Sequence, residues 1–250
     1  MTLPSVFLTT PLAHRGLHDT SQGRPENSRA AVRAAVAAGY GIEIDLQPSS
    51  DGVPMVFHDY DLGRLTASKG PIALQTAVTL AATPLLHGNE GIPTLAEILS
   101  IIGGKVPLLI EFKDQDGALG TNVGALEKAA AKMLASYQGP VAVMSFNPYS
   151  VTALGRLAPE MPRGLTTSAY EYDDWVPLSE HTCDYLREIP DYDSCGASFI
   201  SHEAFDLHRK RVAELKAQGA SVLCWTIRTP AEEAEARLVA QNITFEGYLA

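Results

Sequence analysis

The chain has 250 residues, of which 46% are hydrophobic and 19% are charged. This composition is sufficient for one sizeable core and excludes a disordered chain. The net charge of −10 predicts a surface that repels nucleic acid and acidic membranes, so we expect neither as a partner.

The cysteines and the apolar runs predict where in the cell the protein is located. The three cysteines show no CxxC spacing, which suits a reducing environment. The first residues, MTLPSVFLTTPLAH, lack the features of a signal peptide, and no apolar run is long enough to span a bilayer. We therefore expect a cytoplasmic protein without a membrane span. Its oligomeric state stays open, a homo-oligomer included.

Strands and helices alternate along the chain. Apolar runs predict strands at residues 12–16, 41–47, 106–113, 140–146, 163–167, 196–201, 221–227 and 243–249. Ser28 can cap the first intervening helix and Gly39 can end it, while Thr94 and Glu97 form a capping box for another. A further short strand at 54–57 is expected to fold back on the second strand after the turn at 51–52.

Eight strands with helices between them predict a (β/α)₈ TIM barrel, an α/β fold. An open doubly wound sheet is the alternative, but no GxGxxG turn follows the first strand. Residues 61–91 fit neither element type and are interpreted as a short insertion between the second and third strands, over the barrel mouth. We expect residues 1–250 to form a single domain.

Two strands carry charged side chains on one face. In the second strand Glu43 and Asp45 lie opposite the isoleucines, and in the third Glu111 and Lys113 repeat this pattern. In a barrel these charges point into the mouth at the carboxyl ends of the strands. Three converging carboxylates need a compensating charge, and one divalent cation, Mg²⁺ or Ca²⁺, suits oxygen ligands. A single E-x-D is more often a solvated strand end; two on one predicted face favour a site.

Two histidines lie where barrel enzymes place their chemistry. His14 ends the first strand and His58 follows the folded-back strand, so the pair can accept and donate protons, although a single histidine is more often structural. With Arg15, Lys113 and a divalent metal, the converging groups carry a charge of +1, which a phosphodiester monoanion neutralises. The remaining histidines are interpreted as surface or loop residues: His18, His87, His181, His202 and His208.

Short motifs follow one another in a fixed order between residues 12 and about 228. They are His14-Arg15-Gly16, Pro25-Glu26-Asn27, Glu43-Ile44-Asp45, His58-Asp59 with Leu62 and Arg64, Ile92-Pro93-Thr94-Leu95, Glu111-Phe112-Lys113, Ser145-Phe146 and Trp225-Thr226. The ordered set is far more specific than any single motif, and it resembles one family, the glycerophosphodiester phosphodiesterases.

The resemblance implies a TIM barrel that hydrolyses glycerophosphodiesters to glycerol 3-phosphate and an alcohol, with a divalent metal. By position it implies metal ligands at Glu43, Asp45 and Glu111, and an acid–base pair at His14 and His58. It also implies phosphate contacts at Arg15 and Lys113, with Glu26 near the metal. Phe146 and Trp225 are candidate walls for the glycerol or alcohol group, and core packing is the alternative for both.

The chain departs from the family pattern around the barrel mouth. Arg228 stands where the family usually has Asn, and the last strand leads into Thr244-Phe245-Glu246-Gly247-Tyr248 rather than Thr-Asp-x-Pro. Two alternatives therefore stay open: a phosphodiesterase for lysophospholipids or sugar phosphodiesters, and a non-catalytic barrel that binds a phosphorylated metabolite. The nucleophile is either water or a hydroxyl group of the substrate's own glycerol.

Overall fold

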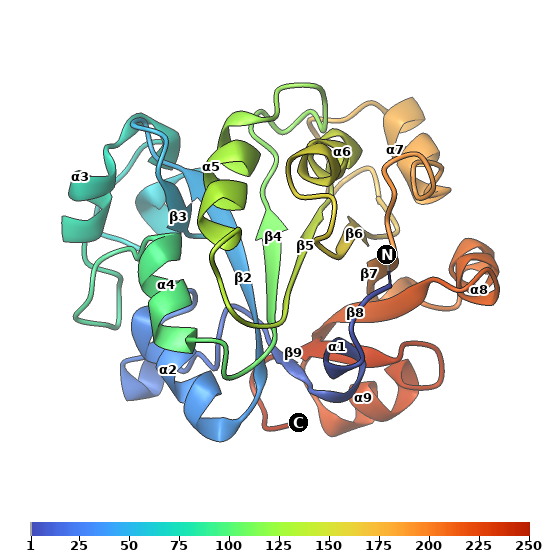
Figure 1. Cartoon of the computed structure of the whole chain (residues 1–250), viewed down its shortest axis with the longest axis horizontal. Coiled ribbons are helices and arrows are strands. Elements are labelled where there is room, and N and C mark those ends of the chain that lie inside the picture. Colours follow the sequence, from blue (N-terminus) through green and yellow to red (C-terminus); the bar gives the residue numbers. More distant parts are fainter. Residues whose placement is uncertain (1) are drawn as a thin grey trace.

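The fold is a closed barrel of parallel strands. In the computed structural model, which describes residues 2–250, each of eight strands pairs in parallel with its neighbours, and β1 closes the circle by pairing with both β2 and β9 (Figure 1). The TIM barrel is thus confirmed and the open sheet was wrong. The barrel strands are β1 (Leu12–Ala13), β2 (Gly41–Pro48), β4 (Leu108–Phe112), β5 (Val141–Ser145), β6 (Arg163–Thr167), β7 (Phe199–Glu203), β8 (Ser221–Ile227) and β9 (Asn242–Phe245).

Helices cover the outside of the barrel (Figure 1). Their ends follow the predicted capping chemistry: the Ser28 hydroxyl accepts from the backbone N–H of Ala31 at 3.0 Å, Gly39 ends the first covering helix at a φ of +78°, and Thr94 forms its capping box with Glu97. The covering helices are α2 (Arg29–Ala38), α4 (Leu95–Ile102), α5 (Ala125–Leu134), α6 (Pro148–Leu157), α7 (Glu180–Arg187), α8 (Lys210–Ala217) and α9 (Pro230–Ala236).

The alternation of side chains in β2 separates the core from the site. Ile42, Ile44 and Leu46 are fully buried in the cluster between barrel and helices, which leaves Glu43 and Asp45 facing the barrel interior. Strand β4 lies in register with β2, so that Asp45 is paired with Glu111. The register therefore brings the carboxylates of two strands to one level.

The amino end of the barrel is closed by α1 (Val6–Thr9). The Phe7 side chain is fully buried against interior residues of the barrel such as Leu109 and Phe199. The Asn242 amide on β9 donates to the carbonyl oxygens of Phe7 at 2.8 Å and Thr10 at 2.7 Å. The interior is thus a packed core below and a polar pocket above.

Residues 54–94 build a small unit beside the mouth. Strand β3 (Pro54–Val56) pairs antiparallel with β2, as the fold-back at 51–52 predicts. It is followed by two 3₁₀ turns (Leu62–Arg64 and Ile72–Leu74) and by α3 (Ala77–Ala82). These segments have an apolar cluster of their own, which includes Met55, Phe57, Leu62, Ile72, Leu80, Leu85 and Ile92.

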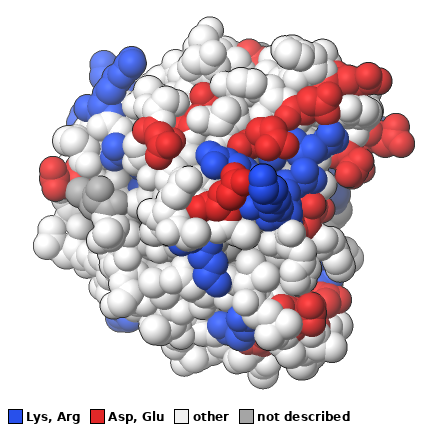
Figure 2. Space-filling model, turned by 90° about the vertical axis from the view of Figure 1, so that its right-hand side faces the viewer, with Lys and Arg blue, Asp and Glu red and all other residues white. Residues whose placement is uncertain are grey.

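Charged residues of both signs gather on the face that carries α7 and α8 (Figure 2), with ion pairs such as Arg187–Asp184 at 2.7 Å. His202 lies under this face. It is fully buried on β7, because the strand continues past Ser201, so the interpretation of His202 as a surface residue was wrong.

Within residues 2–250, no helix has the length and apolar character to cross a bilayer. The three cysteines are free and buried.

Candidate active site

A buried triad of carboxylates lies at the carboxyl ends of β2 and β4. One oxygen from each of Glu43, Asp45 and Glu111 lies within 4.8 Å of the others, and the residues are only 2%, 2% and 6% exposed. This is the convergence that the strand pattern predicted. Three carboxylate oxygens at such spacing could hold one metal ion.

Two carboxyl groups of the triad, those of Glu43 and Asp45, have shifted pKa values. Burial, reinforced by the charges of Asp45 and Glu111, raises the pKa of Glu43 well above its ordinary value. Burial alone would also raise the pKa of Asp45, but the charges of His58, Lys113 and Arg15 outweigh it and hold that pKa below its usual range. Glu43 is therefore the member with the least compensation, and a cation at the triad would supply it.

Lys113 lies beside the triad. Its Nζ is 2.6 Å from a Glu111 carboxylate oxygen and 3.6 Å from one of Asp45. Burial lowers the pKa of Lys113, but these two carboxylates outweigh burial and raise it above its ordinary value. The ammonium group is thus a permanent positive charge in the pocket.

His14 is held by a residue that the sequence did not single out. Its Nδ1 is 2.6 Å from the Glu246 carboxylate, and its Nε2 lies 4.0 Å from Glu43. Burial lowers the pKa of His14, against the opposing effect of the Glu246 hydrogen bond. The Arg228 guanidinium holds the other Glu246 oxygen at 2.8 Å. In the sequence, Glu246 stood out only because the residues after the last strand differ from the family's Thr-Asp-x-Pro pattern.

His58 has a carboxylate partner of the same kind. Its Nδ1 is 2.7 Å from Asp59, whose second oxygen accepts from Arg64 at 2.6 Å. Burial raises the pKa of Asp59, but the hydrogen bonds from His58 and Arg64 outweigh it and hold the pKa far below its usual range. Arg64 reaches across from the insertion and also binds Glu26 at 2.8 Å. The sequence motif contained Asp59 and Arg64, but their roles came only from the structure.

Most of the proposed site residues line one pocket of about 150 Å³. Glu26 does not line it. It lies one contact further out, where its carboxylate accepts from Arg15 at 2.6 Å. Asn27, its neighbour in the motif, donates to Asp45 at 2.9 Å. The pocket is lined by His14, Arg15, Glu43, Asp45, His58, Glu111, Lys113, Met144, Phe146, Trp225, Thr226, Arg228 and Thr244.

The comparison with known families decides the identity. Residues 14–244 match the glycerophosphoryl diester phosphodiesterase family, a range that contains the whole triad and both histidines of the pocket. The chain belongs to this family. The resemblance inferred from the motifs is therefore confirmed.

Known phosphodiesterases are similar in sequence and fold. A glycerophosphodiester phosphodiesterase of Caldanaerobacter subterraneus is 31% identical over 67% of this chain and 70% of its own. Glycerophosphodiester phosphodiesterase 1 of Bos taurus is 26% identical over 93% of this chain and 76% of its own. An Oleispira antarctica phosphodiesterase, solved with the product sn-glycerol-3-phosphate, superposes with a TM-score of 0.77 at 26% identity, covering 96% of this chain and 93% of the other.

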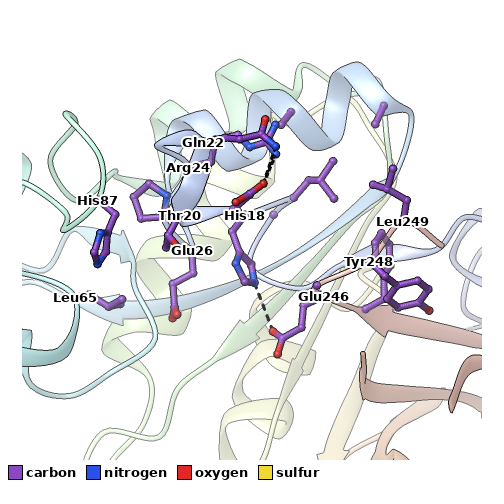
Figure 3. A pocket seen from close by; sticks show the side chains of 18 of the residues that line it. His18, Thr20, Gln22, Arg24, Glu26, Leu65, His87, Glu246, Tyr248 and Leu249 are labelled. Carbon is purple, nitrogen blue, oxygen red and sulfur yellow. Dashed lines mark hydrogen bonds and ion pairs between the residues drawn. The ribbon is translucent and has the colours of Figure 1, made fainter. Parts of the chain in front are cut away.

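A larger groove lies on the other side of Glu246 from the phosphodiesterase pocket. It measures about 1010 Å³ and is lined by residues of the β1–α2 loop, the insertion and the last residues of the chain. Figure 3 shows His18 and Glu246 facing each other there, with 3.5 Å between the ring Nε2 and the carboxylate. Glu246 therefore separates the two hollows: it contacts His14 on one side and His18 on the other.

Proposed function

We propose that the protein hydrolyses glycerophosphodiesters to glycerol 3-phosphate and an alcohol, with one divalent cation and a pair of histidines as acid and base. The observation that carries this proposal is the common pocket. Glu43, Asp45 and Glu111 lie within 4.8 Å of one another in a pocket that His14 and His58 also line. Family membership supplies the reaction class.

The donor set fits a hard divalent cation. Three buried carboxylates offer oxygen ligands only, which favours Mg²⁺ or Ca²⁺ over metals that prefer nitrogen or sulfur. Glu43, Asp45 and Glu111 would hold the ion, which would polarise the phosphoryl group and lower the pKa of a bound hydroxyl or water.

His14 is suited to act as the base. Glu246 accepts from one ring nitrogen, Nδ1, which leaves Nε2 on the pocket side without a proton. The lowered pKa keeps the ring neutral near pH 7, as proton abstraction requires. His14 would therefore take the proton of the attacking oxygen.

His58 is suited to act as the acid. The Asp59 carboxylate lies 2.7 Å from Nδ1 and holds the ring in place, and Arg64 keeps Asp59 ionised. A protonated His58 can give its Nε2 proton to the departing alkoxide. Arg15 and Lys113 complete the site with positive charge for the phosphoryl oxygens.

The decisive experiment measures release of glycerol 3-phosphate from glycerophosphodiesters with and without Mg²⁺ or Ca²⁺. We expect cation-dependent turnover that His14→Ala and His58→Ala each lower by roughly 10²–10⁴-fold, the contribution of acid–base catalysis. Hydrolysis in ¹⁸O-labelled water, with a search for a cyclic phosphate, distinguishes water from the glycerol hydroxyl as nucleophile. Full activity in excess chelator would refute the metal assignment.

A further inference from the structure

Two departures from the family pattern meet in one ion pair. Arg228 follows β8 and Glu246 follows β9, and both lie where this chain differs from the family's usual residues. The Arg228 guanidinium lies 2.8 Å from Oε1 of the Glu246 carboxylate. The pair therefore belongs to this chain and not to the family pattern.

The backbone sets the two residues beside each other. The Glu246 N–H donates to the carbonyl oxygen of Ile227 at 2.9 Å, which places Glu246 next to Arg228 across the ends of β8 and β9. The Arg228 N–H donates to the Glu232 carboxylate at 2.7 Å, in the first turn of α9. Arg228 is thus anchored through its backbone, and its side chain is left to hold the Glu246 carboxylate.

The other oxygen of Glu246 lies between two histidines. Oε2 is 2.6 Å from Nδ1 of His14 and 3.5 Å from Nε2 of His18. Nε2 of His18 is buried and has no hydrogen-bond partner among residues 2–250. A buried nitrogen without a partner is costly, so His18 competes with His14 for this carboxylate. Figure 3 shows His18 pointing to Glu246 from the side of the larger groove.

The Arg228 contact decides this competition. A carboxylate held through one oxygen can still turn about its side-chain bonds, whereas contacts on both oxygens fix its plane and its position. Without Arg228, a small movement of Glu246 would bring Oε2 from 3.5 Å to hydrogen-bonding distance of His18. His14 would then lose the partner that keeps its proton on Nδ1.

We propose that Arg228 is a positioning residue for His14. It holds Glu246 against His14 and away from His18, so that Nε2 of His14 faces the pocket without a proton. The proposal rests on the proposed hydrolase function, in which His14 is the base. The Arg228 side chain is 55% exposed, and exposed ion pairs contribute little to the stability of a fold. Its removal should therefore leave the barrel folded and change the site alone.

Nitrogen NMR of the histidine rings tests the positioning without catalysis. The histidines are labelled with ¹⁵N, the protein is studied without substrate, and the His14 signals are identified by their absence in His14→Ala. We expect wild type to hold the His14 proton on Nδ1 and Arg228→Gln to give a mixture of the two tautomers. Adding His18→Phe to Arg228→Gln should restore the Nδ1 form, because the competing nitrogen is gone. A His14 tautomer that Arg228→Gln leaves unchanged would overturn the proposal.

The kinetic arm measures kcat and KM for a glycerophosphodiester. We expect Arg228→Gln to lower kcat roughly 10- to 100-fold with little change in KM, the scale of a small misplacement of a catalytic group. Arg228→Lys should keep most of the wild-type kcat, because the contact to Oε1 needs one positively charged donor. Adding His18→Phe to Arg228→Gln should raise kcat again. Because Arg228 also lines the pocket, a higher KM at unchanged kcat would mean that it binds the substrate directly, which refutes the positioning role.

Arg237→Gln is the matched control. Arg237 forms a 2.7 Å ion pair with Glu233 at α9 and does not line the pocket, so its replacement removes an arginine and an ion pair away from the site. We expect this variant to keep the wild-type His14 tautomer and kcat.

The two arms separate the two proposals. A tautomer change in Arg228→Gln, in a protein that hydrolyses no diester, would refute the hydrolase function and leave the positioning by Arg228 standing. Hydrolysis with a kcat that Arg228→Gln leaves unchanged would leave the hydrolase standing and refute the positioning.

Discussion

At the scale of single residues, each proposed acid–base histidine is held by a carboxylate that does not line the pocket: Glu246 holds His14 and Asp59 holds His58. The two carboxylates come from places that sequence patterns treat differently. Asp59 follows His58 directly, so the motif contains it. Glu246 lies 232 residues beyond His14 and follows the last strand, and only the closure of β9 against β1 brings the two together.

Glu246→Gln tests the positioning of His14. The amide keeps the size of the side chain but removes the charge, and its N–H₂ group can favour the wrong ring tautomer. We expect kcat to fall roughly 10²–10⁴-fold with little change in KM. Glu233→Gln is the control, since Glu233 on α9 accepts hydrogen bonds from Arg237 and Tyr248 and does not line the pocket. A rise in KM with unchanged kcat would show that Glu246 serves substrate binding instead.

Glu43→Gln tests the metal site through stability. In wild type we expect added Mg²⁺ or Ca²⁺ to raise Tm, since a ligand at 100 times its Kd contributes about 2.7 kcal/mol. The variant should show a much smaller rise. Without metal it should be no less stable than wild type, because burial and the two neighbouring carboxylates disfavour the charged form of Glu43, which the substitution cannot adopt. Thermal unfolding with and without the ion measures both. Equal gains in the two proteins would argue against Glu43 as a ligand.

At the scale of elements, the alternation of apolar and charged residues along the strands predicted the barrel and the triad. Successive side chains of a strand point to opposite faces, so once one face is apolar the direction of every other side chain is fixed. The ends of strands were less predictable. The apolar run of β7 ends before Ser201, but His202 and Glu203 extend the strand because β6 and β8 pair with them. The fully buried His202 is then satisfied by Thr167 at 2.8 Å and by Asp206 at 3.1 Å.

This cluster predicts a pH dependence of stability. Burial raises the pKa of Asp206, but His202 and Arg209 outweigh it and lower that pKa. A carboxyl group whose pKa is lower in the folded state stabilises the fold at pH values above its pKa in the unfolded chain, about 3.9. This stabilisation is lost as the pH falls through the pKa of the folded state. Asp206→Asn should therefore cost stability at pH 7 and progressively less below pH ~4. Denaturant unfolding across pH measures this, with the exposed Asp193→Asn as control. A cost independent of pH would exclude the ionic contribution.

At the scale of the whole molecule, the barrel is sealed at its amino end and open at its carboxyl end. The sealing segment, α1, was not predicted, because its four residues are too few for a helical period. Its role depends on tertiary packing alone: Phe7 fills the space that the interior residues of the strands leave. The eightfold alternation of strands and helices predicted the architecture but contained no information on this seal.

Phe7→Ala tests the seal. Loss of a fully buried phenylalanine costs about 3–5 kcal/mol, including the cavity that it leaves in the barrel interior. Leu8→Ala, at a half-buried neighbouring position, should cost clearly less. Chemical denaturation of both variants compares them. Similar losses for the two would mean that α1 only covers the barrel and does not complete its core.

The buried cysteines can be used to detect opening motions of the protein, because a thiol reagent reaches them only when the fold opens. Burial raises the pKa of the Cys195 thiol to about 11 and that of Cys224 to about 12, so in the folded state both are protonated and shielded from alkylating reagents. Cys224 is fully enclosed on β8, whereas Cys183 lies on α7 in the cluster that also contains Trp175. The order in which a thiol reagent modifies these positions will therefore show whether the loop before α7 opens on its own or only when the barrel itself comes apart.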